Sequence, residues 1–419
     1  MRRVYIKTFG CTLNRADSEI MAGLLKASGR YEIVESRKDA DLVIINSCTV
    51  KKKAETKFFR YLRKTKKPKI AAGCVVQAAL DKNLFSDVSV IGTEQIEMII
   101  KAADKTLKGE VVNFLEPKNL KKLEFPHLKK KKVIEIVPVS SGCIGSCAYC
   151  KVKYARGDLN SFPVDSIKKR VEQGLDNGAK EIWLTSQDMG CYGFDTASSL
   201  HELLNEIFTI KGDYRIRIGM GNPNHILKYL DELISVYQDK RVFKFLHIPV
   251  QAGNDRILKK MNRKYSVSEF EYLVNKLKKN ISGITIATDI ICGFPSETKD
   301  EFFDSVELIK KVKPDVLNIS RFWPRPGTKA AKMKNQIHGN LTKKRSTFLT
   351  NVFHGISQKN NKKWLGWQGK VLIDEYGKDN TFVARNDYYK PVILKGELNL
   401  GEFVDVKIKN VTTFDLRTF

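Results

Sequence analysis

The sequence predicts an α/β protein with three parts: an N-terminal open parallel α/β domain, a central partial (β/α)6 barrel and a small C-terminal antiparallel β-barrel. Three observations predict this fold class. Short apolar runs alternate with helical patterns at the start, a longer β/α alternation follows, and closely spaced strand-like runs fill the end of the chain. We place the domains at residues 1–112, 133–350 and 357–419.

The first part predicts a parallel sheet flanked by helices. We expect strands at residues 4–8, 42–46, 69–72 and 88–91, and helices at 17–27, 54–64 and 94–103. Residues 113–132 carry two prolines and two lysine runs, so they predict a polar linker.

The central part contains six βα units. The predicted strands are residues 133–139, 181–185, 214–219, 243–248, 284–291 and 316–322, with helices such as 164–175 and 268–279 between them. This pattern fits a parallel barrel or partial barrel, in which the active site lies at the carboxyl ends of the strands. The last part has strand-like runs at 368–375, 381–386, 391–395, 402–410 and 413–418. Small antiparallel barrels of this kind often bind nucleic acids.

The chain is strongly basic, with 74 lysines and arginines against 47 acidic residues and a formal charge of +27. Such an excess favours a polyanionic partner, although a solvated, lysine-rich surface is the alternative. Lysines gather at residues 51–69, 118–132 and 329–345, which favours nucleic acid. In the C-terminal barrel we expect Lys370, Arg385, Lys390 and Lys395 to contribute to RNA affinity.

No apolar run approaches the ~20 residues that a membrane-spanning helix needs. The N-terminus lacks the apolar stretch and cleavage site of a signal peptide, so we expect a cytoplasmic protein with no membrane contact. Eight cysteines in a reducing compartment do not predict a disulfide framework, and crowded cysteines there indicate metal binding.

Three cysteines, Cys143, Cys147 and Cys150, follow the first predicted barrel strand with C-x3-C-x2-C spacing. Three thiolates can hold three corners of a cubane cluster and leave one iron open to a small molecule. A structural zinc site or a ferredoxin cluster requires a fourth ligand, and none follows nearby. A zinc knuckle with a distant fourth ligand is the alternative.

Three further cysteines, Cys11, Cys48 and Cys74, each come just after a predicted strand of the first domain. The carboxyl ends of parallel strands meet at one edge of a sheet, where such sheets bind ligands. A lone buried cysteine is usually inert packing. Three on one edge predict a second metal cluster.

The segment 142–150, which reads C-x3-C-x-Tyr-C after the barrel strand, resembles the radical S-adenosylmethionine (SAM) superfamily. That resemblance implies that SAM chelates the open iron and is cleaved to methionine and a 5′-deoxyadenosyl radical. It also implies that Tyr149 shelters the cluster, with its backbone near the adenine.

Further motifs resemble the methylthiotransferase family along essentially the whole chain. They are residues 8–14, 45–50, 72–74, 185–193, 247–253, 288–298 and 321–328, with 384–386 and 389–392 resembling that family's RNA-binding TRAM module. The resemblance implies two [4Fe–4S] clusters, SAM as radical source and methyl donor, an electron donor, and sulfur delivered by way of the auxiliary cluster at Cys11, Cys48 and Cys74.

Some positions depart from the family pattern. Ala252 and Asn254 stand in place of two serines, Ser296 replaces a glycine, and Cys191 stands where a small residue is expected. We interpret Cys191 and Cys292 as structural thiols.

Polar residues at other strand ends are candidates for SAM binding. Gln187 follows the second predicted barrel strand, Gln251 follows the fourth, and Asp289 lies in the fifth. Such groups suit the hydroxyls and the charged amino-acid end of SAM. Hydrogen bonding within the barrel mouth, without ligand contact, is the alternative.

The resemblance implies a tRNA methylthiotransferase that acts on carbon 2 of a modified adenosine beside the anticodon, so the partner is the tRNA anticodon stem-loop. The unactivated C–H bond there requires a radical, and the protein binds and orients the cofactors that supply it. Residues 186–188 and 291–294 resemble the archaeal and eukaryotic branch that acts on threonylcarbamoyladenosine.

A threonylcarbamoyl group carries a carboxylate, which an arginine binds well. We expect Arg217, Arg321 and Arg325 to bind it; the alternative is that they contact phosphates or pair with Asp188 or Asp289. Isopentenyladenosine tRNA and a ribosomal protein aspartate are alternative substrates. A non-enzymatic, metal-stabilised RNA-binding protein is a more distant alternative.

Overall fold

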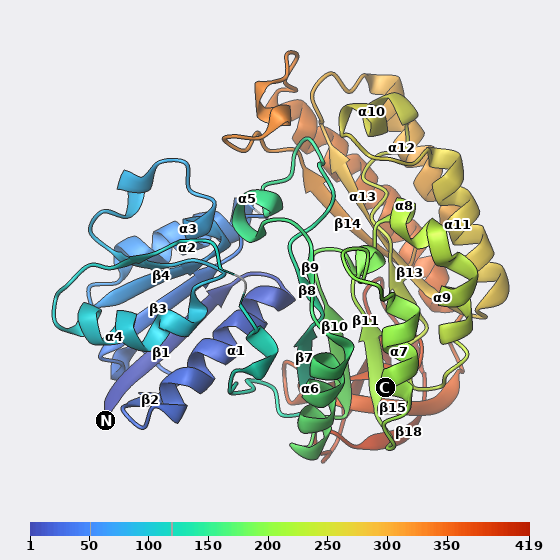
Figure 1. Cartoon of the computed structure of the whole chain (residues 1–419). Coiled ribbons are helices and arrows are strands. Elements are labelled where there is room, and N and C mark those ends of the chain that lie inside the picture. The colour runs from blue at the N-terminus through green and yellow to red at the C-terminus, as the bar shows by residue number, and fades with distance from the viewer. Residues whose placement is uncertain (51, 119) are drawn as a thin grey trace.

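The computed structural model describes residues 1–50, 52–118 and 120–419 and shows three parts (Figure 1). Lys51, the first residue of a predicted lysine cluster, and Asn119, in the predicted linker, lie outside the described residues. Among the described residues, no helix is both long enough and apolar enough to cross a membrane.

The N-terminal sheet is parallel, with the strand order β2-β1-β3-β4-β5-β6. Its strands are β1 Arg2–Phe9, β2 Tyr31–Ile33, β3 Leu42–Ser47, β4 Lys69–Gly73, β5 Ser89–Ile91 and β6 Asn113–Phe114. Four strands were predicted; β2 and β6 were missed because runs of three and two residues carry no periodicity.

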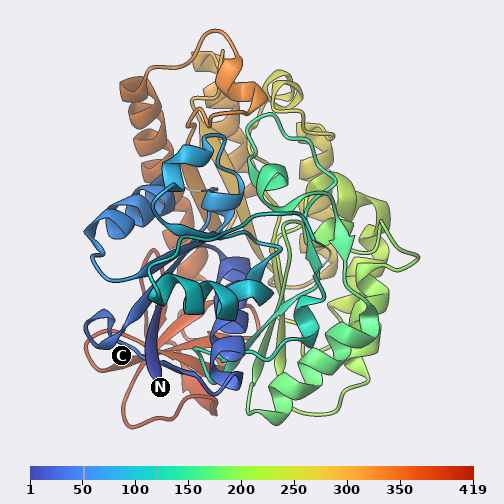
Figure 2. The same cartoon turned by 60° about the vertical axis from the view of Figure 1, so that its left-hand side comes forward.

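Helices cover both faces of this sheet, which explains why every residue of β3 is buried. They are α1 Thr12–Ala27, α2 Lys52–Lys64, α3 Cys74–Gln77 and α4 Ile99–Leu107. Buried side chains of α1 and α4 share one apolar cluster, and those of α2 and α3 share another on the opposite face. Figure 2, which brings this domain forward, shows its blue strands with blue and cyan helices to either side.

The predicted polar linker is packed rather than loose. It contains β6 and a 3-10 turn at Lys122–Glu124. Leu120 and Leu123 are buried in the apolar clusters, and Lys122 is only 3% exposed. The prolines and lysines suggested a solvent-exposed segment. Lys122 is buried instead, because it pairs with a buried carboxylate on α1.

The central part is a partial barrel, as predicted. Its parallel strands are β7 Ile134–Pro138, β10 Glu181–Thr185, β11 Arg215–Ile218, β12 Phe245–His247, β13 Thr285–Cys292 and β14 Val316–Arg321. The triplets β7-β10-β11 and β12-β13-β14 are joined through a parallel bridge between Ile216 and Val242. Across the described residues β7 does not pair with β14, so the barrel stays open.

The other elements of the central part surround these strands or connect them. They are β8 Ser140–Ser141, α5 Val152–Arg156, β9 Asn160–Ser161, α6 Val164–Asp176, α7 Leu200–Phe208, α8 Pro223–Ile226, α9 Leu230–Val236, α10 Asp255–Lys260, α11 Val267–Asn280, α12 Lys299–Val312 and α13 Gly339–Lys362. The outward side of the strands packs on these helices in one large apolar core.

The C-terminal part is a curled, mostly antiparallel half-barrel with the strand order β18-β15-β16-β17-β20-β19. Its strands are β15 Gln368–Tyr376, β16 Thr381–Asn386, β17 Pro391–Lys395, β18 Phe403–Lys407, β19 Asn410–Val411 and β20 Leu416–Arg417. The last predicted run is reduced to β20, which pairs in parallel with β17. In the described structure the edge strands β18 and β19 do not pair, so the sheet is not closed.

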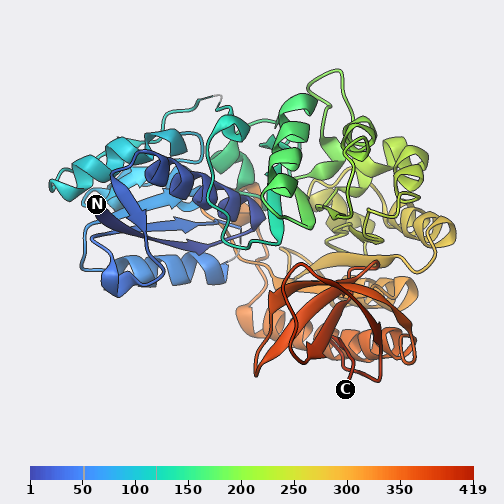
Figure 3. The ribbon, with the colours of Figure 1, turned by 90° about the horizontal axis from the view of Figure 1, so that it is seen from below.

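The half-barrel packs against the inner face of the central strands (Figure 3). Arg217, on β11, lies among three aromatic rings, 5.4 Å from the ring centre of Trp183, 5.2 Å from that of Phe245 and 5.3 Å from that of Tyr389. Tyr389 comes from the C-terminal part, so a cation–π cage joins the two parts.

Two cations that the sequence analysis assigned to RNA are instead paired inside the protein. The side chain of Arg385 is 18% exposed, and its Nε donates to Asp374 at 3.1 Å. Lys390 is buried and donates to Asp315 at 2.8 Å and to Asn361 at 3.2 Å. Lys370 and Lys395 are exposed.

Glu181 at the start of β10 should make stability depend on pH. Burial, together with the nearby Asp374 charge, raises its pKa from 4.5 to about 7. Between these values the folded state binds a proton that the unfolded state has released, so stability falls as pH rises, by at most about 3 kcal/mol. We expect Glu181→Gln to remove this fall, as measured by anaerobic urea unfolding from pH 5 to pH 8. The exposed Glu206→Gln is the control. Parallel stability curves for wild type and Glu181→Gln would contradict the assignment.

Candidate functional site: two cysteine sets on either side of helix α5

The loop with Cys143, Cys147 and Cys150 runs from β8 to α5 and is anchored on two sides. The backbone N–H of Ala148 donates to Met261 O at 2.9 Å, and that of Ala330 donates to Ala148 O at 2.8 Å. At Gly142, φ is +76° and a Cβ would lie 1.7 Å from a backbone oxygen of Asp158, so only glycine fits. The loop is thereby fixed on the carboxyl-end side of the barrel.

Hydrogen-bond donors face each of these sulfurs. The backbone N–H of Gly145 donates to Cys143 Sγ at 3.2 Å, and that of Val152 donates to Cys150 Sγ at 3.4 Å. Burial raises the pKa of Cys143 to about 11 and that of Cys150 to about 12, so metal binding there must release protons. The three cysteines remain partly exposed, which leaves room for a ligand beside them.

Arg263 supplies a charged donor to the third sulfur, and the sequence analysis did not identify it. Its Nη1 donates to Cys147 Sγ at 3.2 Å, its Nη2 to Asn222 at 2.7 Å and its Nε to Tyr265 at 2.9 Å. No motif spacing marks an arginine that lies more than a hundred residues from the cysteine it contacts.

The candidate SAM residues surround this loop. Gln187 follows β10, and its buried Oε1 has no hydrogen-bond partner among the described residues, so it is free to accept from a ligand. Gln251 has φ +74°, and its backbone pairs with β13 at Asp289 and Ile291. The Tyr149 ring lies edge-on to Phe294, with the ring centres 6.4 Å apart.

Asp289 is already engaged within the barrel. Its Oδ1 lies 2.8 Å from His247 Nε2 and accepts from Asn318 Nδ2 at 2.8 Å. His247 and Asn318 were not singled out from the sequence, because only the pairing of β12, β13 and β14 brings them to this carboxylate.

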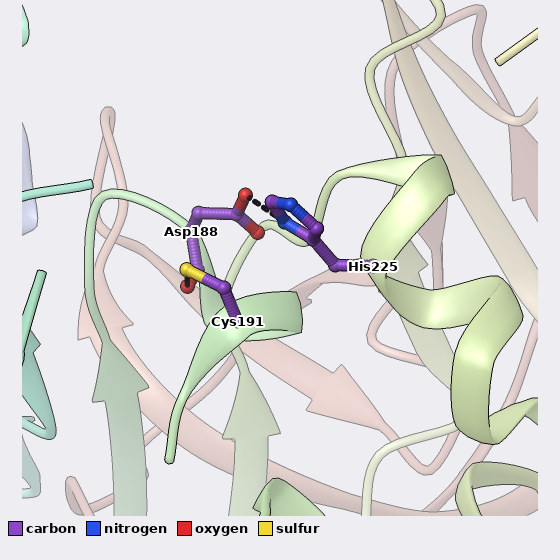
Figure 4. Close-up of side chains that lie close together, drawn as sticks. All are labelled: Asp188, Cys191 and His225. Atoms are coloured by element: carbon purple, nitrogen blue, oxygen red, sulfur yellow. Dashed lines mark hydrogen bonds and ion pairs between the residues drawn. The ribbon is translucent and has the colours of Figure 1, made fainter. Parts of the chain in front are cut away.

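Asp188, Cys191 and His225 form a buried cluster after β10 (Figure 4). Asp188 Oδ1 accepts from the backbone of Gly190 at 3.0 Å and of Asn222 at 2.9 Å, and Oδ2 lies 2.8 Å from His225 Nδ1. The thiol of Cys191 donates to the Asp188 backbone oxygen at 3.3 Å, and burial raises its pKa far above the usual value. The carboxylate oxygens already accept hydrogen bonds and the thiol keeps its proton. We therefore interpret this cluster as a hydrogen-bonded structural group rather than a metal centre. It holds the turn after Gln187.

The other departures from the family pattern have structural roles. Asn254 caps α10, accepting from the backbone of Arg256 at 3.0 Å. Ala252 and Cys292 are buried. Ser296 has φ +66°, a conformation that favours glycine.

The second cysteine set meets at one sheet edge, as the sequence predicted. Cys11 follows β1, Cys48 follows β3 and Cys74 begins α3 directly after β4, and these three strands are neighbours. Hydrogen bonds from the Cys48 thiol lower the pKa of Cys11 to about 7 and that of Cys74 to about 5, while they raise the pKa of Cys48.

Buried amides line this set. Asn14 Nδ2 lies 3.7 Å from Cys74 Sγ, and Asn14 Oδ1 accepts from Cys11 Sγ at 3.3 Å. Asn46 Nδ2 donates to Asn14 O at 2.8 Å. Gly73 has φ +89°, and a Cβ there would lie 2.1 Å from Asn46 Oδ1, so the Asn14–Asn46 pair requires this glycine.

Helix α5 connects the two cysteine sets (Figure 1). It begins two residues after Cys150, and its Ala155 packs against Cys74. Its last residue, Arg156, is 3% exposed, donates to Asp17 of α1 at 2.6 Å and lowers the pKa of Cys74. Lys122 donates to the same carboxylate at 2.8 Å, which completes a buried ionic triad between the first two parts.

Of the three arginines assigned to substrate, one lies between the cysteine sets. Arg325 lies in the loop after β14. Burial lowers its pKa, and the charges of Glu55, Cys150 and Cys48 act in the opposite direction. Its buried Nη1 has no hydrogen-bond partner among the described residues. Arg321 pairs in register with Cys292, on the opposite face of the sheet from Asn318 and Asp289. Arg217 lies in the aromatic cage at the barrel floor. The structure therefore does not bring the three together.

Family models match each part of the chain. Residues 3–92 match Uncharacterized protein family UPF0004, residues 137–309 match the Radical SAM superfamily, and residues 369–418 match the TRAM domain. Among solved structures, the radical S-adenosylmethionine methyltransferase TsrM from Kitasatospora setae has a TM-score of 0.56 at 14% identity, covering 78% of this chain and 77% of that one. The cobalamin-dependent S-adenosylmethionine radical enzyme OxsB has a TM-score of 0.57 at 10% identity, covering 85% and 58%. These two show the fold alone. The chain is a radical SAM enzyme.

Full-length relatives define the family. A probable threonylcarbamoyladenosine tRNA methylthiotransferase of Pyrococcus horikoshii is 43% identical over 99% of this chain and 98% of its own length. The threonylcarbamoyladenosine tRNA methylthiotransferase of Homo sapiens is 40% identical over 97% of this chain and 72% of its own. This chain belongs to the threonylcarbamoyladenosine tRNA methylthiotransferase family.

Removing the carboxylate of the ionic triad should destabilise the protein strongly. Asp17→Asn leaves Arg156 and Lys122 buried without a counter-charge, so we expect a loss of about 3–5 kcal/mol in the free energy of unfolding. The exposed pair of Asp231 with Lys276 is the control, and Asp231→Asn should cost less than about 1 kcal/mol. Anaerobic denaturant unfolding at neutral pH measures both, and equal small losses would contradict the role given to the triad.

Proposed function

We propose that this chain converts threonylcarbamoyladenosine beside the tRNA anticodon to its 2-methylthio derivative by radical SAM chemistry. The observation that carries the proposal is the placement of two three-cysteine sets at either end of α5, with Arg325 between them. A nucleoside that binds there can lose hydrogen on one side and receive sulfur from the other. The family relationship supports the choice of tRNA as the substrate class.

The first set fits a [4Fe–4S] cluster with an open iron. Cys143, Cys147 and Cys150 would hold it, because each sulfur has a hydrogen-bond donor and no fourth protein ligand is needed. With SAM, such a cluster supplies a radical able to take hydrogen from an unactivated C–H bond. Gln187, Gln251, Asp289 and Tyr149 would bind and orient SAM, and the unpartnered Gln187 Oε1 suits one of its donors.

The second set fits an auxiliary [4Fe–4S] cluster. Cys11, Cys48 and Cys74 would hold it, and the lowered pKa values of Cys11 and Cys74 favour the thiolates that iron binds. The buried cation of Arg156 offsets part of the negative charge that such a cluster brings into the interior. Bound there, such a cluster would supply sulfur chemistry, with SAM as the methyl donor and an external electron donor and sulfur source completing the reaction.

Iron content tests the two-cluster proposal. Anaerobically reconstituted wild type should carry about twice the iron of Cys143→Ala/Cys147→Ala/Cys150→Ala, and this variant should keep one cluster and lose SAM cleavage. As a control, Cys191→Ala/Cys292→Ala should keep the wild-type iron content, because these thiols lie outside both sets. Equal iron in wild type and triple variant, or SAM cleavage by that variant, would rule out the assignment.

Arg325 is the residue that favours threonylcarbamoyladenosine over isopentenyladenosine. A threonylcarbamoyl group brings a carboxylate, and a largely buried guanidinium with an unpartnered Nη1 can pair with it. An isopentenyl group would leave the buried Nη1 without an acceptor. A ribosomal protein aspartate also carries a carboxylate, so the tRNA relatives decide between these two substrates.

Substrate turnover tests this role. With tRNA bearing threonylcarbamoyladenosine, Arg325→Gln should lower kcat/KM about 100-fold, the effect of losing one buried charge-assisted contact of about 3 kcal/mol. Arg321→Gln is the control and should stay within about threefold of wild type, because Arg321 faces away from the site. The 2-methylthio product is quantified by mass spectrometry, with isopentenylated tRNA tested in parallel. Faster turnover of isopentenylated tRNA by wild type would overturn the assignment.

A further inference from the structure

Helix α2 presents an exposed basic face. Its buried side, through Phe58 and Leu62, packs on the N-terminal sheet. Its exposed side carries six cations, Lys52, Lys53, Lys57, Arg60, Arg63 and Lys64. Within the described part of the chain, none of the six forms a salt bridge, although 25 such pairs occur elsewhere. Unpaired like charges along one helix repel each other and leave the face ready for a polyanion.

The start of α2 lies at the catalytic site. The helix begins four residues after Cys48, and its Glu55 is close enough to influence the pKa of Arg325. Lys52 Nζ lies 3.1 Å from the ring centre of Trp323, which precedes Arg325 by two residues. The Trp323 side chain is 41% exposed. An indole therefore stands at the rim of the site, where α2 meets the loop after β14.

The segment that follows Trp323 in the chain carries further basic residues. Lys329, Lys332 and Lys334 are exposed, and no salt bridge involves them in the residues that the structure describes. Exposed basic groups thus lie on α2, whose Lys52 contacts the ring, and on the segment that follows the ring in the chain. The C-terminal half-barrel offers less than the sequence suggested, because Arg385 and Lys390 are used internally.

We propose that the basic face of α2, Trp323 and the lysines at 329–334 form an RNA-binding surface separate from the C-terminal half-barrel. Phosphates of the anticodon loop lie along α2 and the 329–334 segment. The ring of Trp323 stacks on an unpaired base next to the target adenosine, and Lys52 moves from the ring to a phosphate. Stacking of this kind contributes about 1–3 kcal/mol per base and tolerates any sequence. The inference rests on the proposed function only in taking a tRNA anticodon loop as the ligand.

Salt-dependent binding tests the basic face. Affinity of the reconstituted, full-length protein for an anticodon stem-loop is measured by fluorescence anisotropy at several salt concentrations. Lys57→Gln/Arg60→Gln/Lys64→Gln should weaken binding at least about tenfold near physiological salt and reduce the slope of log K against log[salt] by about 2. The matched control, Lys26→Gln/Lys101→Gln/Lys108→Gln, removes the same charge from exposed positions of α1, α4 and the residue after α4. Equal slopes in the two triple variants would overturn the proposal.

A fluorescent base tests the stacking role. A stem-loop with 2-aminopurine beside the target position should be quenched on binding wild type, and Trp323→Ala should abolish the quenching and weaken binding about tenfold. Trp323→Phe should retain most of both, since a ring remains. Tyr272→Ala, at an exposed aromatic on α11, should change neither. Unchanged quenching in Trp323→Ala would exclude stacking. SAM cleavage without RNA should persist in every variant, so failure here leaves the proposed reaction untouched.

Discussion

The buried ion pair between Arg156 and Asp17 is the interaction on which the arrangement of the two cysteine sets depends. Arg156 ends the helix that follows the first set, and Asp17 lies on the helix that begins beside the second. Two opposite charges removed from water stay together, because separating them leaves each uncompensated in a low dielectric. Lys122 pairs with the same carboxylate, so the segment between the domains is held at the same point. This ionic triad, together with the packing of Ala16 on β7, holds the first two domains against each other.

This constraint sets the scale of the catalytic site. Helix α5 has five residues and so is roughly 7 Å long. The first cysteine set precedes it, and Cys74 of the second set packs against its Ala155. The charge of Arg156 also favours thiolates at Cys11 and Cys74. One arginine therefore joins the domains, positions the two sets and stabilises negative charge at one of them.

The C-terminal half-barrel acts as a floor for the open barrel. The central strands do not close on themselves within the described structure, so their inner face needs a cover. Tyr389, Arg385 and Leu372 provide it from the C-terminal part. Each part brings one buried acid and one buried cation to this contact. The central part supplies Glu181 and Arg217, and the C-terminal part supplies Asp374 and Arg385. The half-barrel therefore has a structural role in the central part.

The sequence by itself determined the fold class, the positions of most strands along the chain and both cysteine sets, because these follow from local periodicity and short spacing. Cys11, Cys48 and Cys74 were found from strand ends alone, since parallel strands place their carboxyl ends at one edge. Only the tertiary structure decided which distant groups serve them. Arg263 beside Cys147, His247 beside Asp289, and Arg156 between Asp17 and Cys74 come from elements far apart in the chain. The tertiary structure also placed Arg325 and Arg321 apart and directed Arg385 into the interior. The face on which a side chain lies depends on strand register and on domain docking, which composition and spacing do not encode.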